Sequence, residues 1–446
     1  MFNIGIKKIK VIDKTIFLNE TTGEFSYKKS ELFVAGRINF TEILNNFKVS
    51  VIYICLCISN KCNMNCSYCF NQDKDNKVMD FKFAKSIIEK AIDENKYCDK
   101  FFIDVSGSGE PLLNLNLIWE INNLCKKLSN KINKEIILNF VTNGLLLTEK
   151  ISTKLQSEGI LFGISLDGDM YNHNFHRKSN GHNTYELIME NIRKIKNNDY
   201  LGVAVTISNT VFDLVKTIDD LSLYFNTISI KPIRHKELGF NRKITKLWIL
   251  EYQKLTRNIL ILSDNNNISI LKKLLNGDDY FGKFIYRAFM GVKTLNRCDS
   301  GISRFCYDID GTLYGCPPAK VYPEERLIKP NNLQKYKKQI QDTINMCSGC
   351  SYLLLCGGQC QIETLINNGK LNNNMCLFKK KLIDFAMYIS LYIKQNNKLI
   401  YKEIIEFCNE KNERSFRNDE LLKFVKENNY SFIEGKKIYD KLNKKY

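Results

Sequence analysis

The chain has 446 residues, of which 44% are hydrophobic and 26% are charged, and its formal net charge is +18. This composition is ordinary for a soluble globular protein with two or three domains, and it excludes a disordered chain. The longest apolar runs are far shorter than the roughly 20 residues that span a bilayer, and the N-terminus lacks a secretory signal, so we expect a cytoplasmic protein.

The positive charge does not indicate a nucleic-acid partner. Lysine and asparagine are in excess along the whole chain, without an arginine-rich stripe or interleaved aromatic residues. A nucleic-acid surface gathers its basic residues on one face or helix instead. We therefore expect neither nucleic acid nor a membrane as a partner.

The cysteine content points to metal chemistry. The chain has 16 cysteines and no export signal, and a reducing cytosol keeps thiols free, so a disulfide framework is not expected. Ten of the cysteines fall into two patterned groups, as expected for ligands of a metal or cluster.

Residues 1–47 are predicted to form a small β-containing unit. Lys10 to Leu18 alternates enough for a strand, Asn19 to Gly23 is typical of a turn, and Glu24 to Tyr27 is the expected partner strand. The unit is too short for a full domain.

Residues 48–240 alternate short apolar runs with helical periodicity. Amphipathic stretches such as Lys82 to Glu94 and Leu115 to Leu128 separate the runs. This pattern predicts an α/β fold with a parallel sheet and helical crossovers, whose chemistry lies at the carboxyl ends of the strands. The six runs are Val51 to Ile58, Lys100 to Val105, Glu135 to Thr142, Ile160 to Leu166, Gly202 to Ile207 and Thr227 to Pro232.

The first cysteine group, Cys62-Asn-Met-Asn-Cys66-Ser-Tyr-Cys69, follows the first of these runs. Three thiolates on a four-iron cluster leave one iron open to bind a small molecule. A zinc knuckle is the alternative, but zinc sites use paired cysteines or histidines and close all four positions. The four histidines, none of them near this group, are His173, His176, His182 and His235.

The spacing of Cys62, Cys66 and Cys69 resembles the signature of the radical S-adenosylmethionine (SAM) family. The resemblance implies a partial (β/α)6 barrel and a 4Fe-4S cluster whose open iron holds the amino and carboxylate groups of SAM. Ser106-Gly-Ser-Gly109-Glu110-Pro resembles the family's Gly-Gly-Glu-Pro motif, with Ser108 in place of the first glycine. Gly109 and Glu110 would then hold the SAM amino group.

The fourth run ends in Ser165-Leu-Asp167-Gly, which is followed by His173 and Arg177. By the same resemblance, Ser165 and Asp167 would take the ribose hydroxyls, Arg177 the SAM carboxylate, and Tyr68 would lie against the adenine. A helix cap and loop hydrogen bonds explain Asp167 and His173 equally well. Asp169 and Asn174 depart from the family's usual Pro and Asp, and a structural role suits Asn174 as well.

The second cysteine group lies in residues 296–378. Its spacing resembles the SPASM domain, which is appended to radical SAM enzymes that modify peptides and proteins and carries two auxiliary 4Fe-4S clusters. A zinc ribbon is the alternative, but it would leave three of the seven cysteines idle. By the resemblance, the outer cluster would be held by Cys347, Cys350, Cys356 and Cys376, and the inner one by Cys298, Cys316 and Cys360.

The inner set lacks one ligand. Cys306 is an additional candidate for that place; otherwise the open iron is available for a substrate thiolate. Small buried apolar residues are the expectation for the cysteines outside both groups, which are Cys55, Cys57, Cys98, Cys125 and Cys408.

The resemblance implies an iron-sulfur barrel enzyme, and the sequence pattern predicts helices on either side of its cysteine-rich domain. The expected segments are an N-terminal unit (1–47), a radical SAM barrel (48–240), a helical connector (241–295), a SPASM domain (296–378) and a helical extension (379–446). The expected cofactors are three 4Fe-4S clusters and SAM.

The implied reaction begins with reductive cleavage of SAM to a 5'-deoxyadenosyl radical, which takes a hydrogen atom from the substrate. The leading hypothesis is a maturase that forms a thioether or carbon-carbon crosslink in a ribosomally made peptide. One alternative is oxidation of a sulfatase Cys or Ser to formylglycine, which Pro317 and Pro318 disfavour because that family has an Asp after the cysteine equivalent to Cys316. Another is a non-catalytic iron-sulfur redox or sensing protein.

The partners implied are a precursor peptide and an electron donor such as flavodoxin or ferredoxin. The N-terminal unit is shorter than a winged-helix leader-binding module, so a separate leader-binding protein or the C-terminal helices are candidates for that role.

Overall fold

The computed structural model describes residues 6–19, 23–28, 51–72, 74–196, 201–294, 297–328, 333–347 and 349–411. The end of the predicted N-terminal unit and residues 412–446 of the predicted helical extension lie outside the described residues. The strands are β1 (Ile6–Val11), β2 (Lys14–Asn19), β3 (Phe25–Ser26), β4 (Val51–Leu56), β5 (Lys100–Asp104), β6 (Glu135–Thr142), β7 (Leu161–Ser165), β8 (Lys178–Ser179), β9 (His182–Asn183), β10 (Leu201–Ile207), β11 (Thr227–Pro232), β12 (Arg304–Tyr307) and β13 (Leu313–Tyr314).

Helices follow most of the strands of the central sheet. The α-helices are α2 (Phe81–Glu94), α3 (Leu115–Ile132), α4 (Glu149–Ser157), α5 (Met170–His176), α6 (Tyr185–Arg193), α7 (Leu214–Ser222), α8 (Arg242–Asp264), α9 (Ser269–Asn276), α10 (Tyr280–Met290), α11 (Leu333–Met346), α12 (Leu353–Cys356), α13 (Gln361–Ile366), α14 (Asn373–Asn396) and α15 (Lys398–Lys411). The 3-10 helices are η2 (Pro111–Asn114), η3 (Pro317–Val321) and η4 (Pro323–Glu325).

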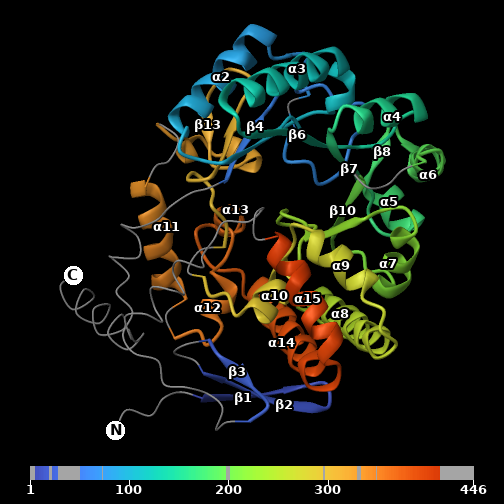
Figure 1. Ribbon diagram of the computed structural model, residues 1–446, viewed down its shortest axis with the longest axis vertical. Helices are drawn as coiled ribbons and strands as arrows, with labels where there is room; N and C mark the ends of the chain where they lie inside the picture. Colours follow the sequence, from blue (N-terminus) through green and yellow to red (C-terminus); the bar gives the residue numbers. More distant parts are fainter. Residues whose placement is uncertain are drawn as a thin grey trace.

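The central sheet has eight strands in the order β11-β10-β7-β6-β5-β4-β12-β13. The first six are parallel neighbours, and α2, α3, α4 and α7 lie on the outside of their arc in Figure 1. Five of the six predicted runs contain one of these strands, and those at β6 and β11 coincide with the predicted bounds. The run Gly202 to Ile207 lies within β10, which begins one residue earlier. The predicted α/β fold is therefore confirmed.

The two faces of the sheet differ in burial. On β4 the side chains of Ile52, Ile54 and Leu56 are completely buried in the hydrophobic core, whereas Tyr53 and Cys55 on the opposite face are only half-buried. The same alternation runs through β6, β7 and β10. Because alternate residues of a strand point to opposite faces, the inner face of the arc lines an accessible interior.

Small residues line part of that interior. Gly163 on β7 pairs with Gly202 on β10, and two residues further along Ser165 pairs with Ala204. Side chains of this size take up little of the inner face near the carboxyl ends of the strands.

The N-terminal segment contains the predicted antiparallel partner, because β2 pairs with β3, but its first predicted strand is wrong. Lys10 to Leu18 is not one strand, because Ile12 turns the chain with φ 53° and joins β1 to β2 as an antiparallel hairpin. The Asp13 carboxylate in this turn accepts a hydrogen bond from the Tyr388 hydroxyl of α14 at 2.5 Å. A distant contact therefore stabilises a turn that lacks the usual Gly or Asn signal. Figure 1 places this hairpin at the end of the molecule opposite α2 and α3.

The cysteine-rich segment begins by extending the barrel sheet, which the sequence did not predict. β12 pairs in parallel with β4, so that Cys306 lies opposite Cys55, and β13 pairs antiparallel with β12. Main-chain hydrogen bonds thus tie this segment to the first barrel strand. The proposed domain boundaries stay predictions.

Cations on β11, at one edge of the sheet, and on β12, next to the other edge, lie near one carboxylate. Asp278, between α9 and α10, lies 3.8 Å from Nζ of Lys231 on β11 and 3.7 Å from Nη1 of Arg304 on β12, and it also pairs with Lys283. These cations, Lys283 foremost, hold the pKa of Asp278 well below its ordinary value. The ion cluster bridges the opening of the barrel.

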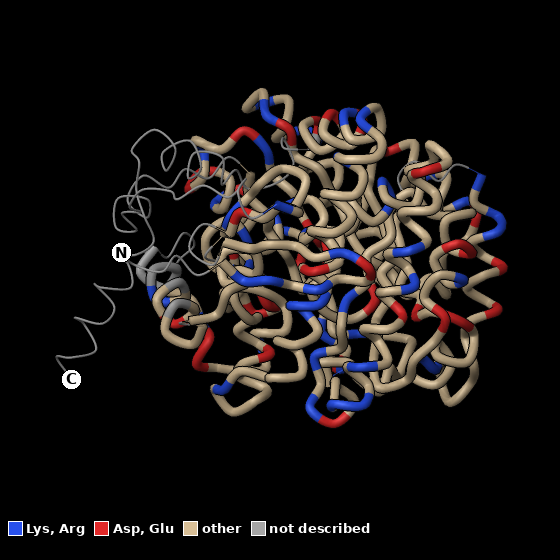
Figure 2. The backbone as a smooth tube through the Cα atoms, turned by 90° about the horizontal axis from the view of Figure 1, so that it is seen from below, with Lys and Arg blue, Asp and Glu red and all other residues tan. Residues whose placement is uncertain are grey.

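Figure 2 shows basic and acidic residues interspersed along the described backbone. None of the helices in the described part of the chain is both long and apolar enough to cross a membrane.

The ion cluster gives a testable prediction. Asp278→Asn should lower the free energy of unfolding at pH 7 by about 1 kcal/mol, a value discounted because these side chains are 36–48% exposed. The folded-state pKa of Asp278 lies below the unfolded value near 4, so its stabilisation is present above pH 4 and lost as the pH falls further.

Urea unfolding at pH 7 and pH 3 measures the difference in the free energy of unfolding between Asp278→Asn and the unaltered protein. This difference should be smaller at pH 3. Glu186→Gln, which removes an exposed carboxylate 3.9 Å from Arg193, is the matched control and should change stability by less than about 0.5 kcal/mol. Equal stability of Asp278→Asn and the unaltered protein at pH 7 would contradict the role given to the cluster.

Candidate active site at the strand ends

The loop that carries Cys62, Cys66 and Cys69 leaves the carboxyl end of β4 and is held by the segment after α5. The Asn65 amide donates to the Lys178 carbonyl at 2.7 Å, and the Ser179 hydroxyl donates to the Asn63 carbonyl at 2.6 Å. All three thiols are free and half-buried, and burial raises the pKa of Cys62 and Cys66. The loop therefore presents three unpaired thiols in a fixed backbone.

His176 is a residue of this site that the sequence did not single out. Its Nδ1 hydrogen-bonds Ser67 Oγ at 2.7 Å, its Nε2 hydrogen-bonds Ser208 Oγ at 2.8 Å, and its carbonyl accepts from the Ser67 amide at 2.9 Å. The ring thus links the cysteine loop to the end of β10. Burial lowers the pKa of His176, so the neutral ring is favoured at neutral pH.

Three predicted SAM contacts lie together beside the loop. Arg177 Nε donates to Asp167 Oδ2 at 2.7 Å, the Tyr68 hydroxyl donates to the same carboxylate, and the guanidinium carbon lies 5.3 Å from the centroid of the Tyr68 ring. Although burial opposes ionisation of Asp167, Arg177 lowers its pKa below the ordinary value. Arg177 Nη1 also lies 3.9 Å from Cys66 Sγ.

The Glu110 carboxylate is buried and accepts three hydrogen bonds. Their donors are the main-chain N–H groups of Leu112 at 3.0 Å and Asn143 at 2.7 Å, and the Thr142 hydroxyl at 2.5 Å. Burial nevertheless raises the pKa of Glu110. This carboxylate ties the ends of β5 and β6 together beside the cysteine loop.

Gly109 is required for close backbone approach. It has φ +64°, and a Cβ there would lie 2.4 Å from the carbonyl oxygens of both Ser59 and Lys61. The Ser108 hydroxyl, in the place of a family glycine, donates to the Ser59 carbonyl at 2.9 Å and so also holds the strand ends together.

Structural roles account for the other polar residues after β7. Asp169 caps α5 by accepting from the Asn172 amide at 2.9 Å, and Asn174 accepts from the amides of Thr184 and Tyr185 at the start of α6. His173 is fully buried, and burial lowers its pKa to about 3. Ser165, by contrast, ends β7 on the half-exposed inner face.

Cys298, Cys316 and Cys360 lie close enough to interact electrostatically, and two arginines lie beside them. Burial opposes ionisation of Cys360, but Arg234 and Arg297 lower the pKa of its thiol below the ordinary value. Burial raises the pKa of Cys316 to about 12. The structure thus brings together the three residues predicted as the inner set.

The predicted outer set also converges. Burial, together with the neighbouring thiols of Cys356, Cys350 and Cys376, raises the pKa of Cys347 to about 12. A buried ion pair connects this set to the inner one. Lys379, which follows Cys376 on α14, has its Nζ 3.1 Å from Oε2 of Glu363 on α13. Glu363 in turn follows Cys360, a residue of the inner set.

A single metal ion does not suit these sets. No three His, Cys, Asp or Glu side chains in the described ranges lie close enough together to hold one ion. A cluster distributes its thiolates over separate iron atoms, whereas a zinc ion gathers four ligands at about 2.0–2.3 Å. Each set consists of free cysteine thiols alone, which are the ligands that iron-sulfur clusters use.

Cys306, the additional candidate for the inner set, lies on β12 against two barrel cysteines, with Cys57 Sγ at 3.6 Å. Of the cysteines expected to be small buried residues, four are buried and Cys55 is half-buried. The four buried ones are Cys57, Cys98, Cys125 and Cys408.

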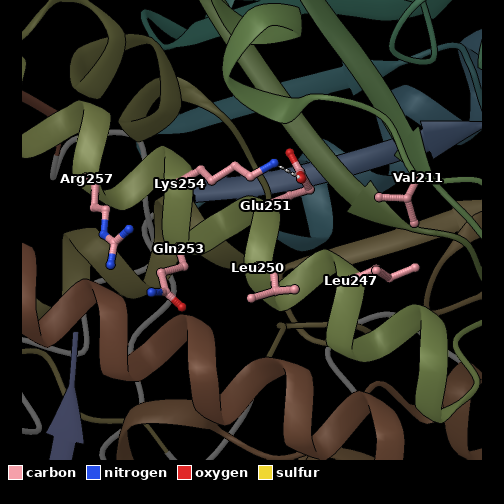
Figure 3. A pocket seen from close by; sticks show the side chains of 7 residues that line it. All are labelled: Val211, Leu247, Leu250, Glu251, Gln253, Lys254 and Arg257. Atoms are coloured by element: carbon pink, nitrogen blue, oxygen red, sulfur yellow. Dashed lines mark hydrogen bonds and ion pairs between the residues drawn. The ribbon is translucent and has the colours of Figure 1, made fainter.

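A pocket on α8 lies apart from these residues (Figure 3). Glu251, one of its lining residues, accepts from Lys254 at 2.6 Å and from the Leu214 amide at 3.1 Å, so it caps α7. The pocket contains none of the candidate site residues.

Comparisons with known proteins agree with this architecture. Residues 56–223 match the radical SAM superfamily. The chain is 26% identical to the radical SAM cyclopropyl synthase TigE of Paramaledivibacter caminithermalis, over 75% of this chain and 71% of that protein. It is 24% identical to a cysteine-type anaerobic sulfatase-maturating enzyme of Clostridium novyi, over 71% of this chain and 90% of that protein.

A third relative and a solved structure complete the comparison. An uncharacterized protein of Methanocaldococcus jannaschii is 40% identical over 116 residues, a match that spans 38% of that protein. The structure described as native anSMEcpe with bound AdoMet superposes with a TM-score of 0.62 at 19% identity, covering 78% of this chain and all of that one. The superposition shows a shared fold.

The contacts of His176 generate a prediction for the cysteine loop. His176→Ala should lower the iron affinity of Cys62, Cys66 and Cys69 by about 10- to 100-fold, because the loop loses side-chain support. His176→Gln, which has polar atoms to reach both serines, should recover part of the loss.

Iron content after anaerobic reconstitution at limiting iron measures this effect. His182→Ala, at an exposed residue of β9, is the matched control. Full iron loading of His176→Ala would show that the loop holds its shape without the histidine.

Proposed function

Because the chain is an enzyme of the radical SAM superfamily, we propose that it reductively cleaves SAM and forms a thioether or carbon-carbon crosslink in a ribosomally made peptide. When bound, the four-iron cluster supplies the electron that cleaves SAM, which yields the radical that removes a substrate hydrogen atom. Cys62, Cys66 and Cys69 would hold this cluster. The observation that carries the proposal is the convergence of their loop with Arg177, Asp167 and the small-residue interior.

Arg177 is suited to bind the SAM carboxylate. Asp167 occupies its Nε at 2.7 Å, while Nη1 points to the cysteine loop at 3.9 Å from Cys66 Sγ. A planar guanidinium held on one edge presents its remaining donors in a fixed direction, which favours bidentate binding of a carboxylate. Asp167 would thus orient Arg177 as well as reach the ribose.

Tyr68 and Gly109 complete the SAM contacts. The Tyr68 ring is fixed by its hydroxyl on Asp167 and by the guanidinium over its face, so it offers a rigid surface for the adenine. Gly109 would bring its backbone close to the amino group, beside Glu110. Ser165 would lie on the inner face near the ribose.

The barrel interior is suited to an extended substrate. Gly163, Gly202 and Ala204 leave open space next to the SAM contacts, and the inner face is half-exposed along several strands. A peptide segment bound there would displace water from the reacting atoms, as radical chemistry requires. The solved anSMEcpe structures include one with a bound peptide, Cp18Cys.

The remaining cysteines support two auxiliary 4Fe-4S clusters, which makes three clusters in all. Cys347, Cys350, Cys356 and Cys376 would hold the outer one, and Cys298, Cys316 and Cys360 part of the inner one. Arg234 and Arg297 would offset the negative charge of the inner thiolates. The auxiliary centres would accept the electron that bond formation releases.

Oxidation of a sulfatase Cys or Ser to formylglycine is the second candidate, favoured by the similarity to sulfatase-maturating enzymes. Pro317 and Pro318 follow Cys316 and start the 3-10 helix η3, in the place where that family has an aspartate. The similarity to a cyclopropyl synthase, whose name implies carbon-carbon bond formation, covers 75% of this chain. We therefore place crosslinking first. A non-catalytic redox or sensing role is excluded, because the chain is an enzyme.

Arg177→Lys tests the SAM site. Lysine keeps the positive charge but lacks the planar fork, so the Kd for SAM should rise at least about tenfold, equivalent to about 1.4 kcal/mol. Anaerobic equilibrium dialysis on the reconstituted protein measures the affinity. Arg193→Lys, at an exposed position, is the control, and unchanged SAM affinity in Arg177→Lys would remove Arg177 from the site.

Co-expression tests the proposed reaction. The chain is produced anaerobically with a short cysteine-containing peptide encoded beside its gene, and the intact mass of the peptide is measured. Crosslinking predicts the loss of a pair of hydrogens, which should disappear when Cys62, Cys66 and Cys69 are replaced by Ala and persist in Cys125→Ala.

Two other outcomes are informative. Loss of sulfur and two hydrogens with gain of one oxygen would identify formylglycine formation from cysteine. Loss of two hydrogens with a new aldehyde that reacts with hydroxylamine would identify its formation from serine, and either result would overturn the crosslinking assignment. An unchanged mass, with SAM still cleaved by the purified protein, would exclude that peptide as the substrate.

A further inference from the structure

Three cysteines meet on the inner face where β12 joins β4, and they form a group that we term the strand thiols: Cys55, Cys57 and Cys306. Cys306 is the central member, because its Sγ lies 3.6 Å from Cys57 Sγ and its thiol also interacts with that of Cys55. Cys55 and Cys306 are direct partners in the parallel register. Two sulfurs from the barrel thus contact one sulfur of the cysteine-rich segment.

The neighbouring backbone leaves space for these sulfurs. A Cβ on Gly107, in the loop after β5, would lie 2.7 Å from Cys57 Sγ and 3.0 Å from Cys55 Sγ. Any side chain there would displace one or both thiols. The glycine therefore allows the two barrel thiols to lie side by side against Cys306.

The strand thiols adjoin the inner cysteine set. Cys316 interacts electrostatically with both Cys55 and Cys306, and Cys57, Cys306 and Cys360 belong to one packed cluster of buried residues. Cys306 also lies between Cys298 and Cys316 in the sequence. It is thus placed to complete the inner set, with two further thiols behind it.

Packing alone accounts less well for this arrangement. Cys125 is buried within α3 among apolar residues, as expected of a cysteine that acts as a small hydrophobic residue. The strand thiols instead contact one another, and Cys55 remains half-buried beside Asp104.

We propose that Cys55 and Cys57 are positioning residues of the inner auxiliary centre, whose Cys306 ligand they contact by S-H···S hydrogen bonds that raise its reduction potential. This inference rests on the inner cluster assigned under the proposed function. Hydrogen bonds to ligand sulfur help set the potential of an iron-sulfur centre. A donor hydrogen beside the sulfur stabilises the extra negative charge of the reduced centre, and so favours reduction.

The test uses the full chain with Cys62, Cys66 and Cys69 replaced by Ala, so that iron and spectra report the auxiliary centres alone. Iron per chain is measured after anaerobic reconstitution, and the midpoint potential by a redox titration followed by electron paramagnetic resonance. Neither peptide nor SAM is added, so the result does not depend on the proposed reaction.

Iron content and midpoint potential should distinguish the ligand Cys306 from its neighbours Cys55 and Cys57. Cys306→Ala should lose iron or change the spectrum of the inner centre. Cys55→Ala and Cys57→Ala should keep full iron content but lower the midpoint potential, and Cys57→Ser, which retains a donor, should lower it less. Cys125→Ala is the matched control and should leave both quantities unchanged, and circular dichroism verifies folding of each variant.

Three outcomes would overturn the inference. Unchanged potentials in both Cys55→Ala and Cys57→Ala would mean that the two thiols only pack. Loss of iron in either would make that cysteine a ligand instead of a hydrogen-bond donor. Iron for a single auxiliary cluster in the starting protein, retained in full by Cys306→Ala, would remove the inner centre, and with it the three-cluster part of the proposed function.

Discussion

Strand β4 is the constraint on which the rest of the site depends. Its outer residues are completely buried in the core, and it pairs in parallel with β5 on one side and β12 on the other. These two pairings fix where the cysteine loop, the Gly109–Glu110 turn and Cys306 can lie. A strand held in this way cannot slip by one residue without turning its buried side chains to the interior, so the register of the whole site is specified.

The sequence predicts those features of the structure that depend on residues close to one another in the chain. The six apolar runs predict the parallel strands, because the buried strands of such a sheet are short, nearly continuous stretches of apolar residues. The cysteine spacings, Arg177 and Asp167 predict candidate site residues, and the structure brings each group together. Their roles toward SAM and the clusters stay proposals.

Contacts between distant parts of the chain could not be predicted in this way. The turn at Ile12 is stabilised by Tyr388, the pairing of β12 with β4 joins residues about 250 positions apart, and His176 gains its importance only by reaching Ser67 and Ser208. The sequence predicts ordinary core residues at Cys55 and Cys57, because no spacing rule connects them to Cys306. In each case the missing information was the identity of the partner.

The Gly163–Gly202 pair on the inner face also bears on how this protein can diversify. A Cβ on Gly163 would meet its nearest neighbours at 3.4–3.7 Å, and one on Gly202 at 3.5–3.7 Å, which are ordinary van der Waals distances. Methyl groups could therefore be added at either position without a clash in the sheet, while the lumen beside the strand ends became narrower. Substitutions at these two positions could therefore change the width of the barrel interior while the sheet stayed intact.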